Sequence, residues 1–140
     1  MSFQLDSRLQ QDCIHLGRFE LCRLLLMNDS QYPWFILVPE LEGIKEIHQL
    51  DVKQRQQLME ESCYLAENLS ALYRPDKINI ASLGNIVSQL HLHHVIRYQS
   101  DKAWPAPVWG AFNTIPYDDA QLGRYLMRLK DKLTACQFII

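Results

Sequence analysis

Three of the five histidines of this 140-residue chain fall within four positions, in the run QLHLHHVIR at residues 89–97. Apolar and polar residues alternate along this run, which predicts a β-strand over residues 89–97. Because successive side chains of a strand point to opposite faces, Gln89, His91 and His93 are expected on one face and the two intervening leucines on the other. A row of imidazoles beside a core strand is costly unless the rings are paired or used. The run is therefore the first candidate site.

Two kinds of chemistry fit this pattern, and a third interpretation gives the histidines no chemical role. The residues alone do not decide among the three. In nucleophilic catalysis on phosphorus, a backbone carbonyl would hold Nδ1 of His91 and its Nε2 would attack, with phosphate oxygens bound by Gln89, His93 and the amides of the turn 84–85. In a metal site, two histidines at i and i+2 would share one Zn²⁺, but a third ligand is required and the next acid is Asp101. In the third reading, the histidines simply face solvent.

The elements around this run predict an α+β protein with an antiparallel sheet. The apolar runs 21–27 and 34–38, joined by the polar turn 28–31, predict a hairpin, and INIASL at 78–83 predicts another strand. The stretch 13–19 is ambiguous, with a turn expected at Gly17, and the apolar tail 136–140 is a further candidate strand. Strands joined by turns, with helices kept separate, are typical of the α+β class.

Two amphipathic helices are expected to cover this sheet, after a short helix at 5–12. Asp51 with Gln54, and Asp118 with Gln121, have the spacing of a capping box, in which the first residue caps the helix and the second caps it in return. Apolar residues then recur at three and four positions after each. The dipeptide 74–75, Arg-Pro, is expected to end the first helix.

Composition limits the function classes. The chain is 48% hydrophobic with a net charge of −2, which favours a single domain over residues 1–140 and gives no electrostatic argument for nucleic-acid or membrane binding. No apolar run is long enough to span a membrane, and residues 1–12 do not resemble a signal peptide, so a cytoplasmic location is expected. The four cysteines are scattered and are expected to be reduced.

The run 89–95, QLHLHHV, resembles the histidine triad (HIT) motif His-φ-His-φ-His-φ-φ, where φ is apolar. The resemblance extends over the hairpin 25–39, the helix 51–73 and the segment 84–89 that leads into the motif. It is greatest to a bacterial branch of HIT proteins that are similar to diadenosine tetraphosphate hydrolases. Members of that branch share the Gln-Leu-His-φ-His variant and a loop of the WPxPVWG type, here at 104–110.

The resemblance implies a homodimer with a joined antiparallel sheet. It also implies a nucleotide hydrolase or nucleotidyl transferase that cleaves at the α-phosphate of a dinucleoside polyphosphate or an AMP conjugate. His91 falls at the nucleophile, which would form a nucleotidyl-histidine, and His93 falls at the third histidine, which would bind a phosphate oxygen. No metal or other cofactor is implied.

The same resemblance assigns three asparagines to the substrate and identifies two departures. Asn28 would contact the ribose, Asn79 would lie on the phosphate side, and Asn85 stands where the family has a glutamine or similar amide, four positions before the first residue of the motif. Gln89 stands where the first histidine of the motif usually stands, and it cannot shuttle a proton near neutral pH. Trp34 stands where many members carry a further histidine. These departures keep open the alternative of a nucleotide-binding protein with little or no turnover.

Overall fold

The computed structural model describes residues 2–139, which form a six-stranded antiparallel sheet with helices on both faces. The strands lie in the order β4-β5-β3-β2-β1-β6, so the α+β prediction is confirmed. In chain order the elements are α1 (Ser7–Asp12), β1 (Cys13–Arg18), β2 (Cys22–Met27), β3 (Trp34–Pro39), the 3₁₀ helix η1 (Ile47–Gln49), α2 (Val52–Tyr73), β4 (Lys77–Ala81), β5 (Leu92–Arg97), α3 (Asp119–Lys132) and β6 (Gln137–Phe138).

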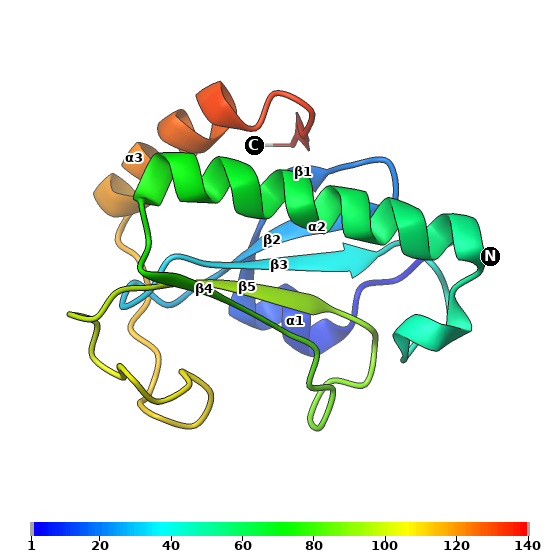
Figure 1. Cartoon of the computed structure of the whole chain (residues 1–140), viewed down its shortest axis with the longest axis horizontal. Coiled ribbons are helices and arrows are strands. Elements are labelled where there is room, and N and C mark those ends of the chain that lie inside the picture. The colour runs from blue at the N-terminus through cyan, green and yellow to red at the C-terminus, as the bar shows by residue number, and fades with distance from the viewer. Residues whose placement is uncertain (1, 140) are drawn as a thin grey trace.

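Side chains of the central strands alternate between two apolar layers. Phe35 and Leu37 of β3 join the layer beneath α2 and α3, whereas Ile36 and Val38 join the layer on the other face. Figure 1 shows α2 and α3 on one side of the sheet, and α1 with the loop 98–117 on the opposite side. Because both faces are covered, β2 and β3 are apolar along almost their whole length. The second layer, beneath α1 and the loop, is the one that meets the histidines.

The two long helices begin where their capping boxes predict. The Asp51 carboxylate accepts the Gln54 backbone N–H at 2.8 Å, and the Gln54 side chain accepts the Asp51 N–H at 2.9 Å. Asp118 and Gln121 repeat the arrangement at the start of α3. Each cap satisfies two backbone donors that a helix start would otherwise leave open. α2 ends at Tyr73, and Arg74 caps it in the left-handed conformation, just before Pro75.

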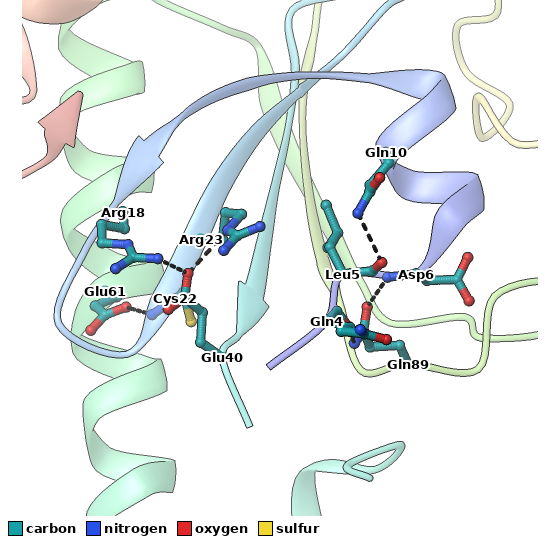
Figure 2. A network of polar contacts seen from close by, with 10 residues as sticks. All are labelled: Gln4, Leu5, Asp6, Gln10, Arg18, Cys22, Arg23, Glu40, Glu61 and Gln89. Carbon is teal, nitrogen blue, oxygen red and sulfur yellow. Dashed lines mark hydrogen bonds and ion pairs between the residues drawn. The ribbon is translucent and has the colours of Figure 1, made fainter. Parts of the chain in front are cut away.

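Buried polar contacts fix α2 on the sheet. The Glu61 carboxylate accepts the backbone N–H groups of Leu21 and Cys22, each at 2.8 Å, which joins the middle of α2 to the start of β2. Figure 2 shows the contact with Cys22. His94 of β5 meets Ser62 at 2.7 Å. Both contacts pair polar groups that burial would otherwise penalise. None of the described helices is long and apolar enough to cross a membrane.

Three sequence predictions of local structure are wrong in part. The expected turn at Gly17 lies within β1, where the backbone of Gln137 in β6 approaches so closely that a Cβ would lie 2.2 Å from its carbonyl oxygen. The predicted strand 78–83 runs instead over Lys77–Ala81. The predicted strand 89–97 begins only at Leu92. Its first residues leave the ladder because the N–H of Leu90 donates to Ile44, away from β3.

Candidate functional site

A cavity of about 390 Å³ lies on the α1 side of the sheet and contains His91 and His93. Its volume is in the range of ordinary small-ligand sites. Its walls come from α1, the end of β2, the start of β3, the turn 83–87 and the loop 108–114. The lining residues are Arg8, Leu9, Asp12, Met27, Asp29, Trp34, Leu83, Gly84, Asn85, Ile86, Val87, His91, His93, Val108, Trp109, Gly110, Phe112 and Thr114.

His91 is held by a backbone carbonyl. Its Nδ1 lies 2.7 Å from the Gln89 carbonyl oxygen. A carbonyl only accepts, so Nδ1 must carry the proton. In the neutral ring the lone pair is then on Nε2, which has no hydrogen-bond partner among the described residues. This is the arrangement that a histidine nucleophile requires.

His93 lies beside His91 on the cavity side. The two ring centroids are 4.7 Å apart at an interplanar angle of 67°. Burial lowers the pKa of His93 to about 3, with further lowering by His91 and His94. His93 is therefore neutral at physiological pH. The alternation predicted for this run thus holds for the two rings, although His91 precedes the strand.

His94 points to the opposite face. Its Nδ1 lies 3.1 Å from the Leu92 carbonyl and its Nε2 lies 2.7 Å from the Ser62 hydroxyl. Burial lowers its pKa to about 4, opposed by the bond to Leu92. The ring is a buried, paired link between β5 and α2. It has no contact with the cavity described above.

The Gln89 side chain is turned towards the N-terminal segment. Its Oε1 accepts the Asp6 N–H at 2.8 Å, and its Nε2 donates to the Gln4 carbonyl at 2.9 Å (Figure 2). The described residues that line the histidine cavity do not include Gln89. The backbone carbonyl of Gln89 therefore orients His91, while its side chain fixes the segment that leads into α1, and α1 supplies Arg8 and Asp12 to the cavity wall.

Replacing Gln89 by alanine is expected to loosen this segment. Two hydrogen bonds of ordinary strength are lost, so the free energy of unfolding should fall by roughly 1–2 kcal/mol. The sharper effect is local: the Asp6 amide should exchange with deuterium much faster. Gln10→Ala is the matched control, since the Gln10 side chain donates to the Leu5 carbonyl of the same segment and does not contact the Asp6 amide. Unchanged protection of the Asp6 amide in Gln89→Ala would contradict the role given to the side chain.

The three asparagines assigned by resemblance occupy different places. Asn85 lines the histidine cavity, in a turn that Gly84 makes with a φ of +78°. Asn28 lines a neighbouring cavity of about 310 Å³, and its Oδ1 accepts the Tyr117 N–H at 2.9 Å. Asn79 is bonded to Arg97, with its Oδ1 at 2.8 Å from a guanidinium nitrogen. Among the described residues that line either cavity, Asn79 is absent.

Arg97 holds the loop that covers the cavity. Its side chain is 2% exposed, and the guanidinium group binds both Asp101 carboxylate oxygens, at 2.8 and 3.0 Å, and the Ala106 carbonyl at 2.8 Å. Asp101 in turn accepts the N–H groups of Tyr98 and Trp104. The loop then continues to Trp109, whose ring packs 5.2 Å from that of His93.

Asp29 is a cavity residue that the sequence did not identify. It is 2% exposed, and its Oδ1 accepts the Gln31 and Ile115 N–H groups. In the sequence, its place in the polar stretch Asn28–Gln31 indicated only a turn. The position of the turn directly after β2 indicated that one of its polar residues could face the site. Nothing in the sequence indicates that this residue is Asp29 as well as Asn28.

Two further observations bear on alternatives. Within residues 2–139, no group of three or more His, Cys, Asp or Glu side chains is placed to hold a metal ion. All four cysteines are free.

Comparison with known proteins finds one matching family model and several similar solved structures. Residues 8–100 match the HIT domain family model. A histidine triad protein from Marinobacter aquaeolei is 47% identical, with a TM-score of 0.94, over 98% of this chain and 100% of that one. Histidine triad proteins from Bradyrhizobium japonicum and Sinorhizobium meliloti are 38% and 40% identical, with TM-scores of 0.92 and 0.91. They are covered over 99% and 97% of their lengths, against 95% and 94% of this chain. The comparison with curated proteins gives no match.

The matched domain spans more than half of the chain. It contains the carbonyl-held His91 and the adjacent His93. The chain belongs to the histidine triad (HIT) family.

Proposed function

We propose that the protein is a nucleotide hydrolase or nucleotidyl transferase in which His91 attacks the α-phosphorus of the substrate. The observation that supports this most strongly is the bond from His91 Nδ1 to the Gln89 carbonyl, which leaves Nε2 free in a cavity. HIT proteins are generally nucleotide hydrolases and transferases, so the family favours the same chemistry.

The reaction would proceed in two displacements. The Nε2 lone pair of His91 forms a nitrogen–phosphorus bond while the bond from phosphorus to the leaving group breaks. The leaving group keeps the electron pair and takes a proton from water. A water molecule then attacks phosphorus and loses a proton to the solvent, the nitrogen–phosphorus bond breaks with its electron pair returning to Nε2, and the nucleoside monophosphate leaves. In a transferase another acceptor would take the place of that water.

The cavity supplies groups for each part of such a substrate. His93 would bind an oxygen of the transferred phosphate, and Asn85 with the turn at Gly84 would lie near the phosphates. The buried carboxylate of Asp29 is an acceptor of the kind that a ribose hydroxyl needs, with Asn28 in the neighbouring cavity. Apolar side chains, including Val108 and Trp109, would face the base.

The substrate that we propose is a dinucleoside polyphosphate or an AMP conjugate. The similarity to diadenosine tetraphosphate hydrolases, seen in the Gln-Leu-His-φ-His run and the loop 104–110, favours the polyphosphates. In this proposal Gln89 takes part in catalysis through its backbone carbonyl, and the leaving group departs without a proton from the residue in that position.

The test is AMP release from diadenosine polyphosphates and from AMP–amine conjugates, measured for the wild type and for His91→Ala. Release by the wild type that is lost in the variant supports the proposal, and equal rates in the two proteins would contradict it.

A second function is favoured by one observation, the turning of the Gln89 side chain away from the cavity. Without a side chain there to protonate a leaving group, the protein would hold a nucleotide and turn it over slowly or not at all. Calorimetry with AMP separates the two functions. Tight binding of AMP, without any product from the diadenosine polyphosphates or the AMP–amine conjugates, would favour a nucleotide-binding protein.

We also propose that the protein forms a homodimer. Strand β4 is an edge of the sheet and pairs only with β5 among the described strands, and its Ile80 is 49% exposed. An edge with unpaired backbone groups is suited to pairing with another chain. Light scattering that gives the monomer mass at every concentration would contradict this proposal.

A further inference from the structure

Trp34 donates a hydrogen bond directly to His93. Its Nε1 lies 2.9 Å from His93 Nδ1, and both residues are buried. An indole N–H can only donate, so Nδ1 of His93 must be the acceptor. The ring that accepts at Nδ1 cannot be an imidazolium, because both nitrogens of an imidazolium are donors. His93 is therefore neutral, with its single proton on Nε2.

The sheet and the loop 98–117 hold the Trp34–His93 pair in place. Ile36 lies opposite His93 across the β3–β5 ladder, so Trp34 is the diagonal neighbour of His93 on the same face. The Trp34 ring packs edge-on against Trp109 at 5.8 Å and against Tyr32 at 6.5 Å. Trp109 also packs against His93 at 5.2 Å. Neither ring of the pair is free to turn without displacing these neighbours.

The charged groups around His93 include two carboxylates, which by themselves would favour its charged form. The groups that share its cavity are Arg8 and Asp12 of α1 and the buried Asp29, together with His91. Arg8 and Asp12 lie 4.0 Å apart as an exposed ion pair. Burial, followed by His91 and His94, lowers the pKa of His93 to about 3, which agrees with the state that the tryptophan bond demands.

We propose that Trp34 is a positioning residue that fixes His93 as the neutral Nε2–H tautomer, so that His93 meets a phosphoryl oxygen as a hydrogen-bond donor and not as an acid. The catalytic half of this statement rests on the proposed function. The tautomer is a property of the free protein. It follows that His93 does not supply a proton to the leaving group, which must then be a weak base or be protonated by water.

The tautomer is measured by NMR on protein labelled with ¹⁵N-histidine, without any substrate. In the wild type, the His93 signals should show a protonated Nε2 and an unprotonated Nδ1 from about pH 5 to about pH 8, a range in which an ordinary histidine titrates. Trp34→Phe keeps an aromatic ring but removes the donor. Since a hydrogen bond to the neutral form is lost, the tautomers should mix and the His93 pKa should rise.

Trp109→Phe is the matched control. Trp109 touches the same His93 ring, and its Nε1 has no hydrogen-bond partner among the described residues. This variant should keep the wild-type tautomer. A wild-type His93 that carries its proton on Nδ1 would overturn the proposal, and so would a Trp34→Phe spectrum identical to that of the wild type. The first of these outcomes does not depend on how well either variant folds.

A kinetic measurement then connects the tautomer to the reaction. In Trp34→Phe, kcat for AMP release should fall roughly tenfold, the size of one lost transition-state contact of about 1.4 kcal/mol, with a smaller change in KM. A new acidic limb should appear in its pH–rate profile as His93 becomes able to protonate. If the wild type releases no AMP, the proposed function fails while the NMR result still decides on the tautomer. An unchanged pH–rate profile in an active Trp34→Phe would overturn the catalytic half of the proposal.

Discussion

His91→Ala is expected to release AMP at least about 10³-fold more slowly than the wild type, because loss of a covalent nucleophile removes the main path of the reaction. The ring that is lost is the one whose Nδ1 is held by the Gln89 carbonyl and whose Nε2 is free in the cavity. The loss should appear in kcat, since the proposed bond from His91 to phosphorus forms only after the substrate has bound. The measurement is steady-state release of AMP across the substrate panel.

Two controls separate chemistry from folding in this experiment. His48→Ala removes an exposed histidine of η1 and should leave the rate unchanged. Calorimetry with AMP on His91→Ala should show that a nucleotide still binds, because the remaining walls of the cavity are intact. A variant that retained more than about a tenth of the wild-type rate, a difference of only about 1.4 kcal/mol in the barrier, would exclude His91 as the nucleophile.

Arg97→Met is expected to lower the free energy of unfolding by about 3–5 kcal/mol, the usual cost of removing one partner from a buried ion pair. The variant leaves the Asp101 carboxylate, 6% exposed, without its partner. It also removes the bonds to Asn79 and to the Ala106 carbonyl. A loss of this size is a large part of the stability of a typical domain. Urea unfolding at neutral pH measures it.

Arg18→Met is the matched control for this variant. Arg18 also pairs with a carboxylate, Glu40, at 2.9 Å, but its side chain is 47% exposed (Figure 2). Exposed pairs contribute about 0–1 kcal/mol, so the same substitution should have little effect there. Equal losses in the two variants, or a loss below about 1 kcal/mol in Arg97→Met, would contradict the structural importance given to Arg97.

The Arg97 pair should also make stability depend on pH. Burial alone would raise the pKa of Asp101, but the hydrogen bonds from Arg97, Tyr98 and Trp104 outweigh it and hold this pKa below its ordinary value. A carboxyl group with a lowered pKa in the folded state adds stability above its unfolded pKa and loses it as the pH falls through the folded pKa. The wild type should lose this contribution in acid. Arg97→Met should lose less stability over the same range.

The features that follow from local rules could be predicted from the sequence. Capping boxes placed the starts of α2 and α3, because a cap depends on residues three positions apart. The alternation of residues 90–93 placed both His91 and His93 on the cavity side. It did so although His91 precedes β5, because Leu90 and Leu92 both belong to the core beneath α2.

The features that depend on distant partners could not be predicted. The Gln89 side chain forms its hydrogen bonds with a segment more than eighty residues away in the sequence. The Asn79 side chain accepts a hydrogen bond from the guanidinium group of Arg97, on the neighbouring strand. Trp34 was seen only as a departure from a family pattern, and its bond to His93 depends on the register of β3 against β5. The periodicity of a sequence does not indicate which of two polar groups a third polar group will hydrogen-bond.

The central claim is that His91 becomes covalently bound to the nucleotide, and mass spectrometry tests it most directly. The wild type is mixed with a substrate that it turns over, quenched during turnover under denaturing alkaline conditions, and digested. We predict a peptide that contains residues 89–97 with the added mass of AMP less one water, and fragmentation that places the addition on His91. Turnover without any adduct, or an adduct on His93 or elsewhere, would contradict the claim.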